Sequence, residues 1–470
     1  MKIQHKFMVM LALVLGLSGC GQVPSPSGQP ARDDRITAMG AVELQRRMVD
    51  GELTAEQVTS AFLERIQRLD QDGPRLNAII EVNPAALSIA RSLDRALAET
   101  GPVGVLHGVP VILKANIDTA DAMSTSAGSL ALANHYAAAD AHIVTLLRRA
   151  GAVILAKANL SEWANFRSEN STSGWSSLGG QTRHPYLLDR NPCGSSSGSA
   201  VAVAARLAPL AIGTETNGSI VCPSGQVGIV GLKPTTGRIS RHGIVPIAIS
   251  QDTAGPMARS VGDLALLMQV IDVPDPRDQP TLARGEITPV IQPNPRSSLA
   301  TFRIGVWRNY WGAGTRPEVD ALLEKQAALL AGLGAEVVDV EINTDQVGDL
   351  SYQVLLYEFK DGINRYLESV NDPGAPGSLD ALISFNREHA EQVMPHFGQD
   401  ILIASQAKGD LRSPEYIHAR TESLRLASQR LREALNGERV DALITVTNGP
   451  AWRTDLENGD DFSMGSSTLA

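Results

Sequence analysis

Short apolar runs alternate with amphipathic stretches through most of the chain, and this alternation restricts the possible folds more than any other feature. Largely apolar runs of strand length occupy residues 109–113, 152–156, 302–307, 337–340 and 440–446. Such runs favour buried strands, because a strand covered on both faces needs apolar side chains along its whole length. The pattern therefore predicts an α/β fold with a buried sheet and helices on its faces.

Helix signals fall between these runs. Thr54 starts a capping-box pattern with Gln57, while Asp140 and Ser260 precede other helical stretches. The predicted helices cover residues 54–69, 83–101, 140–151, 200–206, 260–271, 317–333 and 414–435. Residues 272–296 are rich in Pro, Asp and Arg, which predicts a surface connection between two halves.

Glycines and hydroxyl residues are concentrated in the middle of the chain, between apolar segments. They form three groups, Gly194–Ser199, Gly213–Ser219 and Gly231–Pro234. One interpretation is a flexible linker followed by a hairpin, since Asn217-Gly218 is a strong turn signal. The apolar segments on both sides favour a buried site instead.

A second interpretation is a nucleophile elbow. Residues 194–198 satisfy the pattern G-x-S-x-G, which would make Ser196 the nucleophile of an α/β-hydrolase-type esterase. Such an enzyme also needs a histidine downstream. The candidates are His242, His389, His396 and His418.

A third interpretation is a serine hydrolase whose base is a lysine. A buried lysine can be neutral, and it can then take a proton from the nucleophile through a second, bridging serine. Ser195 and Ser219 lie in two of the glycine-rich groups, and both Lys114 and Lys157 end apolar runs. The residues alone do not choose between these two lysines.

The combined motifs resemble the amidase signature family, and within it they look most like the bacterial peptide amidases. The resemblance is carried by residues 108–117, 157–160, 193–199, 213–223, 231–235 and 252–261. It implies one amidase domain over residues 35–470, with a mixed sheet covered by helices on both faces. Relatives continue into further strands after a segment such as 464–470. The resemblance therefore also implies a C-terminal truncation that removes these strands.

By this resemblance Ser219 is the nucleophile, Ser195 is the bridging serine and Lys114 is the base, whereas Lys157 belongs to a second motif. The bridging serine follows a cis peptide bond in the family, here between Gly194 and Ser195. The oxyanion hole would consist of the backbone N–H groups of Thr216, Asn217, Gly218 and Ser219. No cofactor and no metal is implied.

Two departures from the family pattern bear on loop shape and substrate. Asn217 stands where relatives often have glycine, and asparagine tolerates positive φ. Val221 stands where many relatives have an arginine that holds a free carboxylate in amidotransferase-type enzymes. We therefore expect a peptidic acyl group with a terminal carboxamide, whose hydrolysis releases ammonia. The non-enzymatic alternative is a lipoprotein that binds peptides without hydrolysing them.

The N-terminus has the three parts of an export signal. Two lysines precede an apolar stretch over residues 7–17, and Leu-Ser-Gly-Cys20 follows. This segment resembles a bacterial lipoprotein signal, which implies cleavage before Cys20 and a lipid on its thiol. The resemblance predicts a signal peptide over 1–19, a flexible tether over 20–34, and anchoring to a membrane in the bacterial periplasm or cell envelope.

Three cysteines cannot form a disulfide framework. If Cys20 carries the lipid, Cys193 and Cys222 remain. We expect these two to be free, buried thiols.

Composition excludes several partners. The 41 basic and 51 acidic residues give a formal charge of −10, and aromatic residues make up only 4%. Without a basic block or a stacking platform, nucleic-acid binding is not expected. The sequence has neither a phosphate-binding glycine motif nor H-E-x-x-H spacing, so ATP and metals are not implied. The expected partners are an amide or peptide-amide substrate and, through the lipid, a membrane.

Overall fold

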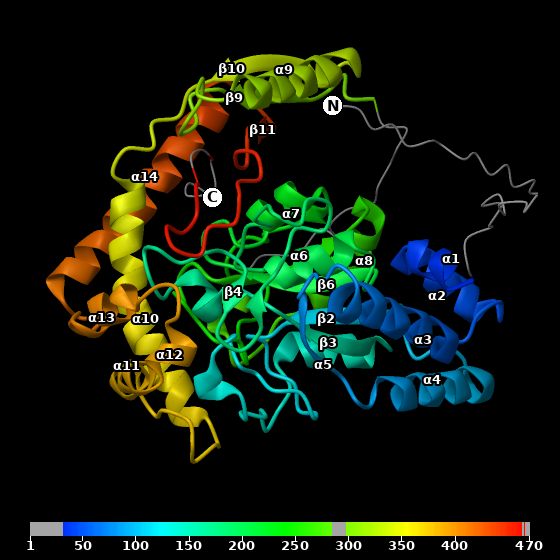
Figure 1. The fold of residues 1–470 in the computed structure, drawn as a ribbon. Coiled ribbons are helices and arrows are strands. Elements are labelled where there is room, and N and C mark those ends of the chain that lie inside the picture. Colours follow the sequence, from blue (N-terminus) through cyan, green and yellow to red (C-terminus); the bar gives the residue numbers. More distant parts are fainter. Residues whose placement is uncertain (1–31, 284–297, 463–464, 466–470) are drawn as a thin grey trace, which may run out of the picture.

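A six-stranded mixed sheet forms the centre of the structure, which is a computed structural model (Figure 1). In spatial order the strands are β1 (Ile79–Val82), β3 (Val153–Ala158), β2 (Pro110–Lys114), β6 (Leu210–Glu215), β8 (Thr253–Ala258) and β7 (Val230–Gly231). Strands β3, β2 and β6 run parallel, whereas the remaining neighbours pair antiparallel.

The three parallel strands in the middle of this sheet are buried along their whole length. This burial explains why β2 and β3 read as almost continuous apolar runs in the sequence. The strands predicted over 109–113 and 152–156 are therefore confirmed to within two residues. The third strand, β6, lies in a segment for which no strand was predicted.

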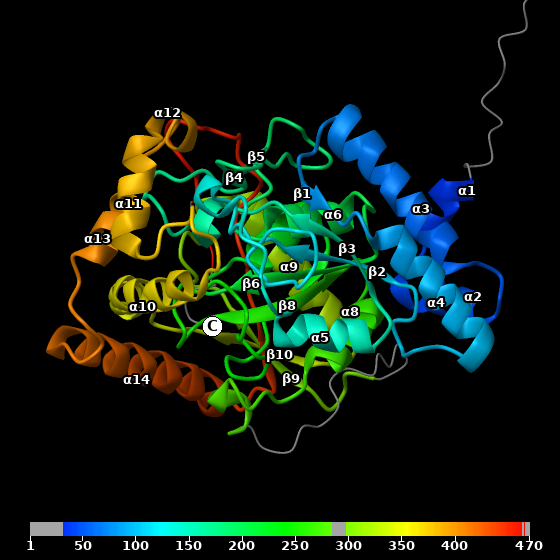
Figure 2. The ribbon, with the colours of Figure 1, turned by 90° about the horizontal axis from the view of Figure 1, so that it is seen from below.

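Helices cover both faces of the sheet, as predicted. Helix α6 (Ser197–Ala204) packs on one face against β2, β3, β6 and β8, and it is buried on all sides. Helices α5 (His142–Arg149) and α8 (Val261–Ile271) pack together on the other face (Figure 2). Helices α3 (Ala55–Ile66) and α4 (Ala86–Thr100) pack on each other next to β2 and β3.

The predicted helix starts can be compared with the hydrogen bonds that cap each helix. Thr54 Oγ1 accepts the N–H of Gln57 at 3.1 Å and Gln57 Oε1 accepts the N–H of Thr54 at 3.3 Å, so the capping box is confirmed. Ser260 caps α8, also as predicted. The prediction that Asp140 caps a helix is wrong, because α5 begins two residues later. Asp140 instead accepts the N–H of Ala120 at 2.8 Å.

A second, smaller sheet has three parallel strands, β10 (Glu336–Val340), β9 (Arg303–Trp307) and β11 (Ala442–Ile444). Helix α9 (Pro317–Gly332) connects β9 to β10, and helix α14 (Pro414–Gly437) precedes β11. The ends of all five elements lie within two residues of their predictions.

Four further helices form an arm beside the main sheet. They are α10 (Val347–Ser369), α11 (Leu379–Glu388), α12 (Ala390–Val393) and α13 (Asp400–Gln406). Helices α10 and α14 lie side by side along this arm (Figure 1). Apolar side chains of the arm share a buried cluster with Trp163 and Phe166 of the main body. No element was predicted in this stretch.

The remaining α-helices and β-strands are short: α1 (Arg32–Ala38), α2 (Ala41–Val49), α7 (Val221–Val227), β4 (Trp175–Ser176) and β5 (Gly180–Gln181). The structure describes residues 32–283, 298–462 and 465. The predictions for Cys20 and for the signal peptide lie outside these residues, as do most of the tether and part of the 272–296 connection. Helix α1 includes the last residues of the segment predicted as tether. Within the described ranges, no helix is both long enough and apolar enough to cross a membrane.

Candidate active site

Lys114 is the last residue of β2 and is fully buried. Its Nζ lies 2.7 Å from Ser195 Oγ, 2.9 Å from Thr214 Oγ1 and 3.2 Å from the Thr214 carbonyl oxygen. Burial lowers the pKa of Lys114 to about 7, although the carboxyl groups of Asp252 and Glu215 act in the opposite direction. A large fraction of this amine is therefore neutral near pH 7, as a base that accepts a serine proton must be.

Ser195 lies in the loop that precedes α6, and it is fully buried. The peptide bond between Gly194 and Ser195 is cis, as the resemblance implied. A Cβ atom at position 194 would clash with Ser161 Oγ, which explains the glycine there. The backbone of Ser195 is also held, because its carbonyl oxygen accepts the N–H of Ser161 at 3.1 Å.

Ser219 lies in the loop between β6 and α7, with 8% of its surface exposed. Its carbonyl oxygen accepts the backbone N–H of Ser196 at 3.1 Å, so this loop lies directly beside the one that carries Ser195. The structure thus brings Lys114 and Ser195 into hydrogen-bonding contact and has the Ser219 loop next to them.

The carboxylate of Glu215 shapes the loop that follows β6. It is buried, and it accepts the backbone N–H groups of Gly218 at 2.9 Å, Ile220 at 2.6 Å and Val221 at 3.0 Å. Gly218 has a φ of +87°, a conformation that glycine adopts without steric cost. Asn217 does not share this conformation, so its tolerance of positive φ is not used here.

The N–H of Gly218 is therefore directed at Glu215 and not toward a substrate. The N–H groups of Thr216, Asn217 and Ser219 have no acceptor among the residues that the structure describes. Three of the four predicted oxyanion donors are thus free for a ligand. The Thr216 side chain is fixed, because its Oγ1 donates to Asp252 at 2.5 Å, and burial raises the pKa of Asp252 to about 6.

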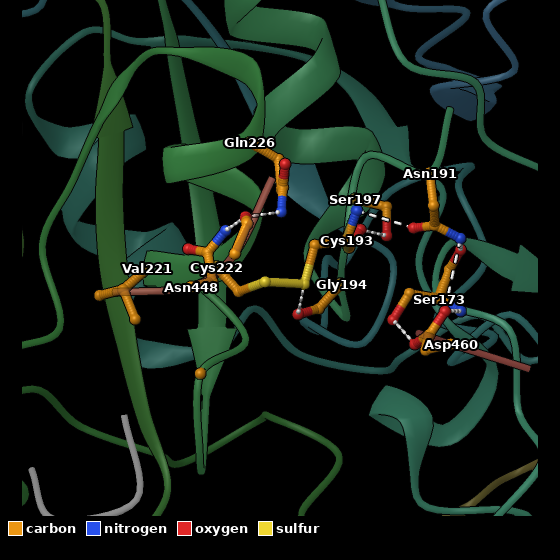
Figure 3. The surroundings of a disulfide bond; sticks show 12 residues. Ser173, Asn191, Cys193, Gly194, Ser197, Val221, Cys222, Gln226, Asn448 and Asp460 are labelled. Carbon is orange, nitrogen blue, oxygen red and sulfur yellow. Dashed lines mark hydrogen bonds between the residues drawn. A yellow bond between two sulfur atoms is a disulfide. The ribbon is translucent and has the colours of Figure 1, made fainter. Parts of the chain in front are cut away.

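Cys193 and Cys222 form a disulfide, so the expectation of two free thiols is wrong (Figure 3). Their Cα atoms lie 6.0 Å apart, although the two cysteines are 29 positions apart in the sequence. Cys193 lies in the loop before Ser195, and Cys222 lies in the first turn of α7, just after Ser219. The sequence could not reveal this approach, because it depends on two loops that meet only in the folded chain.

The Amidase family model matches residues 57–466. This chain belongs to the amidase family. It is therefore an enzyme that hydrolyses amide C–N bonds, and its mixed sheet with flanking helices is the amidase signature fold.

Two curated proteins illustrate the range of its relatives. A probable amidase of Arabidopsis thaliana is 36% identical over 443 residues, which cover 93% of this chain and 84% of that protein. A glutamyl-tRNA(Gln) amidotransferase component of Halorhodospira halophila is also 36% identical, covering 89% of this chain and 84% of that protein.

Among solved structures, the peptide amidase PAM in complex with the competitive inhibitor chymostatin is 45% identical. It matches with a TM-score of 0.86 and covers 92% of this chain and 88% of its own. The native peptide amidase from Stenotrophomonas maltophilia is likewise 45% identical, with a TM-score of 0.85, covering 92% of this chain and 87% of its own.

The α/β-hydrolase interpretation does not hold for this amidase. Ser196, which would be the nucleophile in that interpretation, is fully buried. The Ser196 hydroxyl donates to the Thr214 carbonyl oxygen at 3.0 Å and accepts the Thr214 N–H at 3.2 Å. Both bonds tie Ser196 to the backbone of β6, so this serine joins α6 to the sheet.

The second candidate lysine of the amidase, Lys157, is fully buried in β3. Its Nζ donates to the Ile117 carbonyl oxygen at 2.5 Å and to Thr125 Oγ1 at 3.2 Å, and burial lowers its pKa to about 8. Neither partner is a serine. Lys157 therefore holds the segment that follows β2, and the two lysines that the sequence left equivalent have different surroundings.

A groove of about 720 Å³ opens beside the loop of this amidase that carries Ser219. Thr216, Asn217 and Val221 contribute to its lining, and so do Arg420 and Leu424 of α14. Most of the remaining lining consists of apolar and hydroxyl side chains. The groove therefore has room for a group much larger than a single small carboxylate.

Sequence reasoning gave no role to Thr214 or to Glu215, although both lie within a matched motif, and it gave none to Asn116. Asn116 Nδ2 donates to Thr214 Oγ1 at 3.1 Å, which orients a hydroxyl that contacts Lys114. A signal for Glu215 does exist in the sequence. An acid directly before a glycine-containing loop can accept the N–H groups that such a loop leaves unpaired.

Proposed function

We propose that this amidase is a serine hydrolase that removes ammonia from the C-terminal carboxamides of peptides. The observation that carries the proposal is the 2.7 Å contact between Lys114 Nζ and Ser195 Oγ, beside the loop of Ser219. In this proposal Ser219 is the nucleophile, Ser195 is the bridging serine and Lys114 is the base.

The reaction begins when the neutral amine of Lys114 accepts the hydroxyl proton of Ser195, while Ser195 Oγ accepts that of Ser219. Ser219 Oγ bonds to the amide carbon, and the carbonyl oxygen becomes an oxyanion. The proton then passes from Lys114 through Ser195 to the amide nitrogen, the C–N bond breaks, and ammonia leaves. Water attacks the acyl-enzyme through the same relay and releases the peptide acid.

We assign the oxyanion to the backbone N–H groups of Thr216, Asn217 and Ser219. Donors fixed in advance stabilise the tetrahedral intermediate without a reorganisation cost at the moment of reaction. Two contacts fix this loop: Asp252 holds the Thr216 hydroxyl, and Glu215 holds the N–H groups on the far side of the turn.

A peptidic substrate is supported by Val221 and by the groove beside it. Valine replaces the cation that amidotransferase-type relatives have at this position, and the groove of about 720 Å³, which Arg420 and Lys233 also line, is large enough for the side chains and backbone of a peptide. The similarity to the peptide amidase from Stenotrophomonas maltophilia supports the same substrate class.

The test is a substrate panel on the purified chain from residue 21 onward. Ammonia release would be measured for peptide amides, for the same peptides as free acids, and for glutamine. We expect release from the peptide amides alone and, by mass spectrometry, an acyl group on Ser219. Ser219→Ala is the matched control. Release by Ser219→Ala at the wild-type rate would refute the assignment, and preference for glutamine would refute the substrate class.

We also propose that the chain is exported and anchored by a lipid on Cys20 in the bacterial periplasm or cell envelope. The order of lysines, apolar stretch and Leu-Ser-Gly-Cys20 supports export. The Cys193–Cys222 disulfide supports it independently, because disulfides persist in oxidising compartments. In a bacterial host, the full chain should incorporate labelled palmitate and sediment with membranes, and Cys20→Ala should do neither. Identical labelling and sedimentation of the two chains would contradict the proposal.

A further inference from the structure

The Cys193–Cys222 disulfide joins the two segments that carry the proposed catalytic serines. Cys193 lies two residues before Ser195, and Cys222 lies three residues after Ser219. We propose that this disulfide positions Ser195 against Ser219, so that full turnover requires the bond. The inference rests on the proposed function, and it extends that function to residues outside the catalytic chemistry.

The segment around Ser195 is linked to the segment around Ser219 at two points, one on each side of Ser195. On its C-terminal side, the N–H of Ser196 donates to the Ser219 carbonyl oxygen at 3.1 Å. On its N-terminal side, Cys193 is bonded to Cys222. These two links, one on each side of Ser195, together set how the Ser195 segment lies relative to the Ser219 segment.

Each half of the disulfide is anchored to its own element. The N–H of Cys193 donates to Asn191 Oδ1 at 2.7 Å, and the Cys193 carbonyl oxygen accepts the Ser197 hydroxyl at 2.6 Å (Figure 3). The N–H of Cys222 donates to the Gly218 carbonyl oxygen at 2.8 Å. The loop and α7 therefore keep their local shapes without the disulfide, and what the disulfide adds is their relative placement.

The bond is shielded from solvent. Cys193 and Cys222 are 4% and 3% exposed and share a buried apolar cluster with Trp452. Asn191, which anchors Cys193, donates its Nδ2 to the Ser173 carbonyl oxygen at 3.0 Å, and its N–H donates to the Trp452 carbonyl oxygen at 2.8 Å. The disulfide is thus enclosed by packed side chains and by hydrogen-bonded backbone.

A loss of placement affects the chemical step more than substrate binding. The proton must pass from Ser219 to Ser195 to Lys114 across hydrogen-bond distances, and displacements of about 1 Å at such sites cost roughly 100-fold in rate. The groove, by contrast, is lined only in part by residues of the Ser219 loop, and most of its lining comes from elsewhere, including Leu424 of α14. We therefore expect removal of the disulfide to lower kcat at least about tenfold while KM changes less than about threefold.

The experiment compares wild type with Cys193→Ser, Cys222→Ser and the double variant, all measured at 25 °C. Each single change breaks the same bond, so we expect all three variants to lose kcat equally. The matched control is Leu44→Ala in α2, a buried change that lowers stability and is remote from the disulfide. At a temperature below its Tm this control should keep the wild-type kcat, which separates lost placement from lost stability.

Two further measurements test the role of the disulfide without relying on the proposed peptide substrate. Alkylation of denatured wild type should find no free thiol at Cys193 or Cys222. The rate at which a fluorophosphonate labels Ser219 needs no peptide, and it should fall with kcat in all three variants. Free thiols in the wild type would overturn the positioning role of the disulfide, as would wild-type kcat and labelling in the double variant. Labelling at Ser219 without ammonia release from peptide amides would instead refute only the substrate.

Discussion

Glu215 Oε1 accepts a hydrogen bond of 2.9 Å from the backbone N–H of Gly218, the residue before the proposed nucleophile. The other oxygen of this carboxylate accepts the N–H groups of Ile220 and Val221. One buried side chain thus satisfies three donors on both sides of Ser219. The shape of the loop that carries Ser219 therefore depends on the Glu215 carboxylate.

Glu215→Gln should therefore impair both stability and turnover. The amide keeps one acceptor oxygen and turns its NH₂ group toward a backbone N–H, which leaves buried donors unpaired at a cost of about 1–3 kcal/mol in the free energy of unfolding. We expect kcat to fall by about 10- to 100-fold, since the oxyanion donors shift with the loop. Urea denaturation and steady-state kinetics measure the two effects, and an unchanged kcat would contradict the positioning role.

The pH profile should follow the ionisation of Lys114. Burial lowers its pKa to about 7, so the amine is mainly protonated below that pH and mainly neutral above it. Because only the neutral amine accepts a proton, kcat/KM should rise tenfold per pH unit below about 7 and level off above it. Measurement from pH 5 to 9 on a peptide amide tests this, and a flat profile would rule out a titrating base in this range.

The two buried lysines should separate chemistry from stability. Lys114→Met should lower kcat by about 100- to 10,000-fold, as expected for loss of a general base. Lys157→Met should leave kcat within about threefold. It should nevertheless lower the free energy of unfolding by about 1–3 kcal/mol, because the Ile117 carbonyl oxygen loses its donor. The reverse pattern would exchange the two roles.

Substitution at Val221 should change which acyl groups are accepted. Val221→Arg places a cation beside the groove, where it should lower kcat/KM for peptide amides at least about tenfold and create activity on amides that bear a free carboxylate. Val221→Ile is the matched control for side-chain bulk without charge and should keep the peptide preference. Equal selectivity of the arginine variant and the wild type would show that this position does not select the substrate.

Two helical glycines should respond to alanine with opposite signs. A Cβ on Gly198 of α6 would clash with backbone atoms of Ala78 and Asn159, so Gly198→Ala should lower the free energy of unfolding by about 1–3 kcal/mol. A Cβ on Gly262 of α8 would have its nearest neighbour 3.9 Å away. Gly262→Ala should therefore raise the free energy of unfolding by about 0.4–1 kcal/mol. Thermal denaturation of both variants checks the difference in sign.

Much of the fold could be predicted because its strands are buried on both faces and its helices carry local start signals. The apolar run that became β2 and the capping box at Thr54 are signals of this kind. The helix start at Asp140 failed, because its carboxylate bonds to Ala120 from a different segment. A local pattern cannot report a partner that only the folded chain supplies.

The candidate site also contains features that the sequence predicts and features that only the folded chain reveals. The motifs around Ser195 and Ser219 are visible in the sequence, whereas the choice between Lys114 and Lys157 needed either a family resemblance or the contacts of each amine. The pairing of Cys193 was predicted wrongly, since it depends on a loop-to-loop approach with no local signature.

The proposed catalytic residues all lie between positions 114 and 219, on or next to adjacent strands of one sheet. Part of the groove wall comes from α14, which begins some two hundred positions later at Pro414. We therefore expect mutations in that helix to alter acyl preference without changing the surroundings that lower the pKa of Lys114. Because the groove wall and the proposed catalytic residues come from different parts of the chain, substrate preference can change in evolution while the catalytic residues stay the same.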